Sequence, residues 1–158
     1  MNLLAVKMDK EKAEEVLSWK YEAPYDFYNN EMNEEELSEL LNGTYSAVMA
    51  ANKDLIGFFC IGKSAQVPRG WNFGVYEEEW IDMGLGMNPA LVGQGNGTSF
   101  GKFVLKEIEE KSDGQSVRLT VASFNKRAIH LYEKLGFLAK DRFSTEAAEF
   151  ITMVRAVK

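Results

Sequence analysis

The sequence predicts a single α/β (α+β) domain over residues 1–158, and two observations carry that prediction. Strand-like segments, with short apolar runs or alternating polarity, occur between helix-like segments whose apolar residues recur three and four positions apart. The composition is 46% hydrophobic and 12% aromatic, which is enough apolar material for one core in a chain of 158 residues.

The N-terminal segment is predicted to form a strand followed by a helix. Residues 2–6 are mostly apolar and are typical of a short strand. Asp9 is a favourable N-cap, and the apolar residues after it recur on one helical face. We expect this helix to end at Pro24, because proline lacks the backbone N–H that a helix interior needs. An aromatic connection over residues 22–30 leads to the next helix.

A second helix and a hairpin are predicted next. Asn33 is a cap with an acid at the third helical position, and the helix that it begins is expected to end at Asn42-Gly43. Residues 45–51 and 55–61 are strand-like and are separated by a short polar turn. They therefore predict an antiparallel hairpin.

The second half of the chain alternates strands and helices. It begins with a glycine-rich stretch, residues 62–74. The elements that the pattern predicts after it are a strand over 79–87, a helix over 98–111, a strand, turn and helix within 117–136, and a closing pair of strands over 138–143 and 149–157.

A glycine-alternating turn between the strand over 79–87 and the helix over 98–111 predicts a phosphate site. Gly93, Gly95 and Gly97 can adopt positive φ and allow a ligand close to the backbone, and the helix start offers unpaired N–H groups and the positive end of its dipole. An ordinary loop is the plain alternative. The Rossmann fingerprint needs a third glycine at another spacing, and a P-loop needs a lysine that is absent here.

A second motif lies in residues 117–137 and reads Asn125, Ala128 and then Leu131-Tyr132-Glu133-Lys134-Leu135-Gly136-Phe137. With the glycine turn, it resembles the acetyl-CoA-dependent N-acetyltransferases of the GNAT superfamily. The motifs of that family have the forms Arg/Gln-x-x-Gly-x-Gly/Ala and Asn…Ala…Leu-Tyr-Glu-x-x-Gly-Phe. The resemblance covers roughly residues 80–156. Val92 departs from it, because it stands where Arg or Gln is usual.

The resemblance implies a fold and an activity. The GNAT fold has a mixed, mostly antiparallel central sheet of about six to seven strands with helices on both faces. The implied activity is direct transfer of an acetyl group from acetyl-CoA to a primary amine, on a small molecule or a peptide N-terminus, without a metal. The alternative is a CoA-binding module of the same fold that senses its ligand without catalysis.

The resemblance also implies which residues bind acetyl-CoA. Backbone N–H groups of the glycine turn would hold the pyrophosphate. Backbone groups of the preceding strand would pair with the pantetheine arm, and one N–H there would polarise the thioester carbonyl. The implied residues are Leu85, Met87, Val92, Gly93, Gln94, Gly95, Asn96, Gly97, Asn125 and Tyr132.

Tyr132 is the implied catalytic acid, whose phenol would protonate the departing CoA thiolate. It follows Asn125 by seven residues, or two helical turns, so the two side chains project to a similar side. The plain alternatives are a core aromatic for Tyr132 and a helix N-cap for Asn125.

Acyl transfer to an amine also requires a neutral nucleophile, which points to a general base or a pKa-lowering pocket. Asp82 is the candidate base, acting directly or through water, and Glu79 is the alternative. Strand alternation puts these two acids on opposite faces. A solvated acid at a strand edge is the plain reading of either.

The acceptor is expected between the first two helices and the stretch over residues 62–74. The aromatic surface there comes from Trp19, Tyr21, Tyr25, Phe27 and Tyr28. Asp26 and Glu31 supply negative charge, and the combination suits an ammonium group. The plain alternative is that these aromatic residues close the core beneath Pro24.

The net charge argues against some classes of partner, and the single cysteine argues against a disulfide. A net charge of −6 and a pI near 4.9 argue against nucleic acid, and we expect no membrane partner either. Cys60 is the single cysteine, so no intramolecular disulfide forms. The N-terminus has no signal-like apolar segment, and we expect a cytoplasmic monomer or homodimer.

Overall fold

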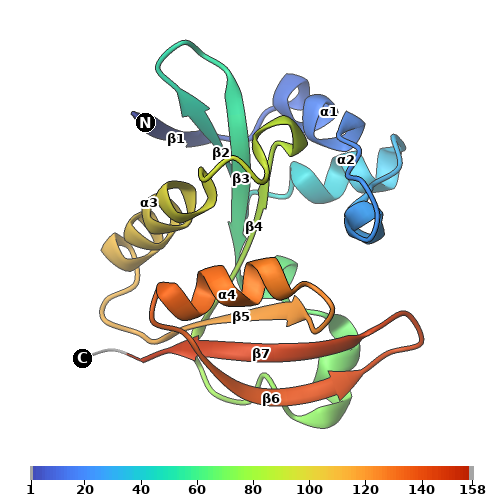
Figure 1. The fold of residues 1–158 in the computed structure, drawn as a ribbon, viewed down its shortest axis with the longest axis vertical. Helices are drawn as coiled ribbons and strands as arrows, with labels where there is room; N and C mark the ends of the chain where they lie inside the picture. The colour runs from blue at the N-terminus through green and yellow to red at the C-terminus, as the bar shows by residue number, and fades with distance from the viewer. Residues whose placement is uncertain (1, 157–158) are drawn as a thin grey trace. The chain divides into compact units, whose positions relative to one another are not determined.

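The computed structural model describes residues 2–156 and has the mixed strand and helix content that the sequence predicts (Figure 1). The strands are β1 (Leu3–Lys7), β2 (Tyr45–Ala50), β3 (Leu55–Ile61), β4 (Ile81–Met87), β5 (Val117–Ala122), β6 (Leu138–Ser144) and β7 (Glu149–Arg155). The α-helices are α1 (Lys10–Ser18), α2 (Glu34–Leu40), α3 (Gly97–Glu110) and α4 (Lys126–Lys134). Short 3-10 helices are η1 (Tyr25–Tyr28), η2 (Gly62–Ala65), η3 (Pro68–Phe73) and η4 (Pro89–Leu91).

The strands hydrogen-bond in the order β1-β2-β3-β4-β5-β7-β6. β1 and β2, β2 and β3, β5 and β7, and β6 and β7 pair in antiparallel fashion, whereas β4 and β5 are parallel. The expected mixed, mostly antiparallel sheet is therefore confirmed. None of the helices within residues 2–156 has the length and the apolar composition needed to cross a membrane.

The chain divides into two compact units. Unit 1 comprises the chain up to Cys60 together with Leu85–Phe100, and unit 2 comprises Ile61–Gly84 together with the chain from Gly101 onward. Each unit has its own buried residues and is described separately below.

Unit 1 is built on α1, α2 and the hairpin of β2 and β3. The Asp9 carboxylate accepts from the Lys12 N–H at 2.9 Å, and Asn33 accepts from the Glu36 N–H at 2.8 Å, so both predicted N-caps are confirmed. The buried residues that share this core are Met8, Ala13, Val16, Leu17, Trp19, Leu40, Ala47 and Leu55.

The first helix ends earlier than the sequence predicts. α1 stops at Ser18 rather than at Pro24, because the chain becomes extended at Trp19 (ψ 138°). This change of direction buries the indole of Trp19, which is 8% exposed and stacks on the Phe58 ring with a centroid distance of 6.3 Å. Burial of a large aromatic side chain outweighs one further helical turn here.

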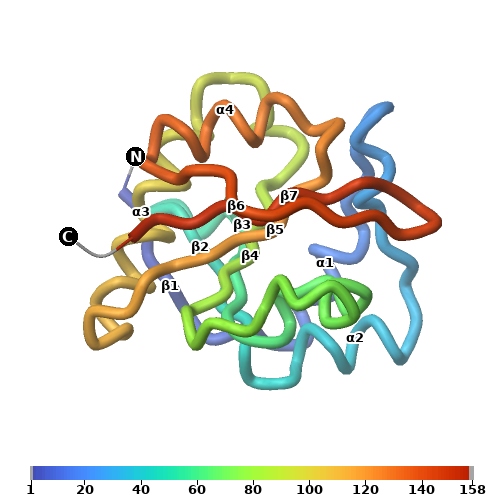
Figure 2. The backbone as a smooth tube through the Cα atoms, turned by 90° about the horizontal axis from the view of Figure 1, so that it is seen from below, coloured from blue at the N-terminus to red at the C-terminus, as the bar shows by residue number. Residues whose placement is uncertain are grey.

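Unit 2 contains β5, β6, β7 and α4. In Figure 2, α4 lies on one side of these strands and the segment of η2 and η3 lies on the other. Phe73 of η3 stacks on Phe143 of β6 with a centroid distance of 6.0 Å. The stretch over residues 62–74, expected as a glycine-rich loop, thus contains two 3-10 helices.

Candidate active site

The glycine turn connects η4 to α3 within unit 1. Gly93 and Gly95 have left-handed φ values of 80° and 79°, as the sequence predicts. Gly97 differs from the prediction, because it is the first residue of α3. Residues 93–95 are exposed, and a Cβ built on Gly95 would have no atom within 4 Å. A dissolved anion can therefore reach the backbone of this turn.

Side chains of the turn hold its shape through bonds to carbonyl groups. The Gln94 amide donates to the Ala90 carbonyl at 2.9 Å, and the Asn96 amide donates to the Leu91 carbonyl at 3.3 Å. The Asn96 carbonyl accepts from the Phe100 N–H at 3.0 Å, which begins the helical bonding of α3. The Val92 N–H donates to the Pro89 carbonyl at 3.4 Å. Donors for an anion are therefore best sought from Gly93 onward.

The end of β4 is tied to the start of β3 in unit 1. The Asn88 N–H donates to the Ile56 carbonyl at 2.8 Å, and the Asn88 side chain donates to the Leu55 carbonyl at 3.1 Å. Adjacent residues of a strand direct their backbone groups to opposite edges. The backbone groups of Leu85 and Met87, which the sequence assigned to the pantetheine arm, therefore face the edge of β4 that points away from β3.

One aromatic residue that the sequence places on the acceptor side also reaches this edge, a contact that the sequence did not predict. The hydroxyl of Tyr21, between α1 and η1, donates to the Met87 carbonyl at 2.8 Å. Burial raises the pKa of Tyr21 to about 12, so this hydroxyl stays protonated at physiological pH. No local pattern connects Tyr21 with Met87, since 66 residues separate them.

The second motif forms α4 and its two ends in unit 2. The Asn125 side chain accepts from the Ala128 N–H at 3.1 Å, so its structural role as an N-cap is confirmed. At the other end, the Gly136 N–H donates to the Glu133 carbonyl and the Phe137 N–H donates to the Tyr132 carbonyl, both at 3.0 Å. This is a Schellman motif, with Gly136 left-handed at a φ of 98°.

The Schellman motif also fixes the ring of Tyr132. Tyr132 is 8% exposed, and its ring meets the ring of Phe137 edge-on at a centroid distance of 6.0 Å. A hydrophobic contact between these two positions commonly accompanies the motif. The pattern Leu-Tyr-Glu-x-x-Gly-Phe therefore describes a helix end that holds one tyrosine in a defined place.

Asp82, the predicted base, lies in a buried ion pair of unit 2. Its two carboxylate oxygens accept from Nε and Nη2 of Arg118 at 2.7 and 2.9 Å, and Gln66 donates to it at 2.7 Å. Asp82 is 3% exposed and Arg118 is 1% exposed. This geometry gives Asp82 a structural role and does not support the role of a base.

Arg118 is the residue that sequence reasoning missed in this part of the protein. Its guanidinium also donates to the carbonyls of Val75 and Glu78 and lies over the rings of Tyr76 and Trp80, at 5.1 and 5.4 Å from their centroids. Burial lowers the pKa of Arg118, but the hydrogen bonds and charge of Asp82 outweigh that cost, and the pKa lies above its usual value. Glu79, the alternative base, is exposed, and its carbonyl accepts from the Gln115 side chain at 3.0 Å.

The predicted acceptor residues differ in their exposure. Trp19 belongs to the core of unit 1, as the plain alternative reading expects. Tyr25 and Tyr28 lie in η1 and are half-buried, and Phe27 contacts the Tyr28 ring edge-on at 5.2 Å. Asp26 is exposed beside them. Tyr25 and Tyr28 thus remain candidates for contact with an acceptor, whereas the indole of Trp19 is enclosed.

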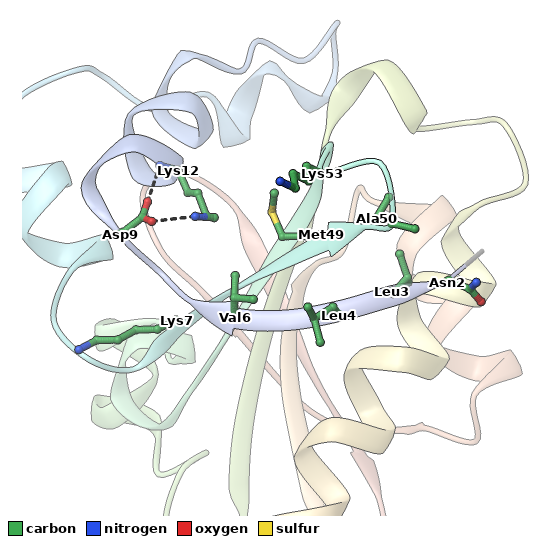
Figure 3. Close-up of a pocket in the computed structure, with 11 residues that line it drawn as sticks. Asn2, Leu3, Leu4, Val6, Lys7, Asp9, Lys12, Met49, Ala50 and Lys53 are labelled. Atoms are coloured by element: carbon green, nitrogen blue, oxygen red, sulfur yellow. Dashed lines mark hydrogen bonds and ion pairs between the residues drawn. The ribbon is translucent and has the colours of Figure 1, made fainter.

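A groove in unit 1 lies apart from all of these residues. It follows β1 and the end of β2, and Figure 3 shows the Lys12 ammonium turned to Asp9, which it contacts at 2.7 Å. Its lining includes no residue that the sequence assigned to a site. Of the assigned residues, unit 1 contains Leu85, Met87, the glycine turn and the acceptor candidates, and unit 2 contains Asp82, Asn125 and Tyr132.

Comparison with known proteins yields one family and many similar folds. The model of the acetyltransferase (GNAT) family matches residues 11–137. Among solved structures, the acetyltransferase (GNAT family) from Bacillus anthracis is 16% identical over 96% of this chain and 93% of its own, with a TM-score of 0.71. A chimera of the spermidine N-acetyltransferase SpeG from Vibrio cholerae and hSSAT is 19% identical over 98% and 95%, with a TM-score of 0.66. At these identities the likeness shows the fold alone. No curated protein matches the chain.

Proposed function

The chain belongs to the acetyltransferase (GNAT) family, and from this premise we propose that it is an acetyl-CoA-dependent N-acetyltransferase that acts on a primary amine. The acceptor would be a small molecule or a peptide N-terminus. The observation that carries the proposal is the exposed turn at Gly93 and Gly95, whose left-handed glycines precede the start of α3. Such a turn binds an anion through backbone N–H groups.

The donor's pyrophosphate would be held by backbone groups of the turn. Val92 supplies no charge at the position where the family has Arg or Gln, so affinity would depend on backbone N–H groups and the positive end of the α3 dipole. Gln94 and Asn96 stabilise the turn, because their side-chain amides donate to the carbonyls of Ala90 and Leu91. These amide donors are therefore already used within the protein. The binding of the phosphates therefore depends on close backbone approach, for which Gly95 has open space.

The chemistry would be direct acyl transfer. The amine nitrogen forms a bond to the thioester carbonyl carbon, a backbone N–H of Leu85 or Met87 stabilises the oxyanion, and the C–S bond then breaks. Tyr132 donates its proton to the thiolate and is reprotonated from solvent, to which the amine loses its own proton. The defined ring position of Tyr132 at the end of α4 supports this role.

The acceptor would be a cation before it reacts. Tyr25 and Tyr28 offer aromatic faces, and exposed Asp26 adds negative charge beside them. A protein of similar fold is named as a spermidine N-acetyltransferase, so a polyamine belongs among the acceptors to be tested. The choice between a polyamine and an α-amine depends on side chains that the fold does not specify.

An acceptor panel read by release of free CoA thiol tests the proposal. The panel contains spermidine, a free amino acid, a peptide with a free N-terminus, and an N-acetylated peptide without amines as control. We expect thiol release with at least one amine and none with the blocked peptide.

Added salt should raise the KM of a cationic acceptor several-fold and the KM of acetyl-CoA much less, since exposed charge pairs are screened. Tight CoA binding without thiol release from any amine would instead identify a sensing module.

A further inference from the structure

Tyr21 lies at the start of the segment between α1 and α2, and hydrogen bonds join the two ends of this segment. Its backbone N–H donates to the Asn29 side chain at 2.7 Å, and the neighbouring Lys20 ammonium donates to the Asn30 carbonyl at 3.0 Å. These two bonds join the beginning of the segment to its end across η1. The segment that carries Tyr25 and Tyr28 is therefore one connected piece of unit 1, and Tyr21 makes one of the two bonds that join its ends.

The Tyr21 hydroxyl connects this piece to the last residue of β4. A carbonyl can only accept, so Tyr21 is the donor in its 2.8 Å bond to the Met87 oxygen. The hydroxyl is partly removed from solvent, where a hydrogen bond to a fixed partner is stronger than in water. The bond therefore restrains the orientation of the peptide group that follows Met87.

The bonded carbonyl faces the edge of β4 that matters for the proposed function. Asn88 turns its backbone N–H toward β3, so Met87 turns its carbonyl the other way, together with the backbone groups of Leu85. That edge is the one assigned to the pantetheine arm and the thioester. Tyr21 thus reaches the donor side of the reaction from the segment that carries the acceptor candidates.

We propose that Tyr21 is a positioning residue for acyl transfer, and this inference rests on the proposed function. Its hydroxyl holds the Met87 peptide so that the ligand-facing edge of β4 and the Tyr25–Tyr28 segment keep one relative arrangement. The two substrates then meet in a reactive geometry. Loss of the hydroxyl leaves the pyrophosphate turn unchanged but loosens this arrangement, and small displacements of reacting groups reduce the rate of transfer.

The Tyr21→Phe variant tests this inference. Removing one hydrogen bond should lower kcat roughly three- to tenfold. The acetyl-CoA Kd, measured by calorimetry, should stay within about twofold of wild type because the turn that dominates it is untouched. Rates are expressed per acetyl-CoA-binding site, so that a loss of folded protein does not appear as a loss of kcat.

Tyr45→Phe is the matched control. Tyr45 lies on β2, is also half-buried, and bonds through its hydroxyl with Glu39 and Cys60. Its loss removes a similar bond in the same unit, and kcat per binding site should match wild type. Equal kcat in Tyr21→Phe and wild type, or a parallel fall of kcat in both variants, would overturn the inference.

The pH profile separates positioning from proton transfer. The pKa of Tyr21 is raised to about 12, so the group does not titrate in the working range, and the profile of kcat in Tyr21→Phe should keep its wild-type shape at a lower level. If Tyr21→Phe lost the fall of kcat at high pH that wild type shows, Tyr21 would itself be the general acid, and the positioning role would be overturned. Absence of acetyl-CoA binding and thiol release in wild type would overturn the proposed function, and with it this inference.

Discussion

The glycine turn of unit 1 and the Asp82–Arg118 pair of unit 2 are both polar features near motifs that the family shares, yet they differ in what their polar groups do. The pair is enclosed, and each charged group already has its partners. The turn is exposed, with open space at Gly95. A charged residue beside a motif is therefore a good candidate for chemistry only where its bonding capacity remains available to a ligand.

The largest test of this contrast is Asp82→Asn. It removes the buried counter-ion of Arg118 and leaves only the partly exposed Glu78 carboxylate, 3.3 Å from Nη1. Breaking a buried pair costs about 3–5 kcal/mol. We expect the free energy of unfolding, measured by urea denaturation, to fall by roughly that amount. The pH dependence of kcat/KM should not change. The double variant Asp82→Asn with Arg118→Met removes both charges and should recover part of the loss. If the variant kept wild-type stability but lost the fall of kcat/KM at low pH, Asp82 would instead be the base.

Tyr132→Phe is expected to have the next largest effect, about a hundredfold on kcat, because general acid catalysis typically contributes that much or more. The acetyl-CoA KM should change little, since the ring stays packed against Phe137 and the hydroxyl would act on charge that develops during the reaction. Tyr76→Phe is the control in the same unit, because the Tyr76 hydroxyl accepts from the Val67 N–H and bonds to Thr120. It should lose stability and keep kcat. Wild-type turnover in Tyr132→Phe, with chemistry rate-limiting, would remove Tyr132 from the mechanism.

Gly95→Glu should weaken acetyl-CoA binding about thirtyfold, or roughly 2 kcal/mol, by placing a side chain and a like charge where the phosphates approach. Gly114→Glu is a matched control, because Gly114 has a φ of 80° against 79° at Gly95 and also has no atom within 4 Å of a built Cβ. Both variants carry the same backbone strain, so both should lose similar stability. Calorimetry should show the loss of affinity in Gly95→Glu alone. Equal affinities in the two variants would place the phosphates elsewhere.

Much of the local structure could be predicted from the sequence because the bonds that produce it join near neighbours. The N-caps at Asp9, Asn33 and Asn125 each bond a backbone N–H three residues ahead. The end of α4 at Gly136 follows from a left-handed residue that only glycine adopts at little cost. Positive φ at Gly97 was wrongly predicted, since glycine at a helix start can simply adopt the helical conformation.

Tertiary packing decided the features that local patterns could not show. α1 ends at Ser18 because Trp19 leaves the helix to enter the core, a gain that depends on Phe58 and not on the residues beside Trp19. Asp82 is paired because Arg118, 36 residues later, lies beside it in the neighbouring parallel strand. A carboxylate in the same sequence context but without that partner would remain available as a base.

The sequence by itself determined the strand and helix pattern, the caps, the glycine turn and the family, because each depends on residue types at short, fixed spacings. Only the tertiary structure decided which polar groups have their partners and which face a ligand. The bond from Tyr21 to Met87 joins residues 66 positions apart, and the bonds of Asp82 to Arg118 join residues 36 apart. Such contacts arise from the folding of the whole chain, since no pattern of neighbouring residues brings these groups together.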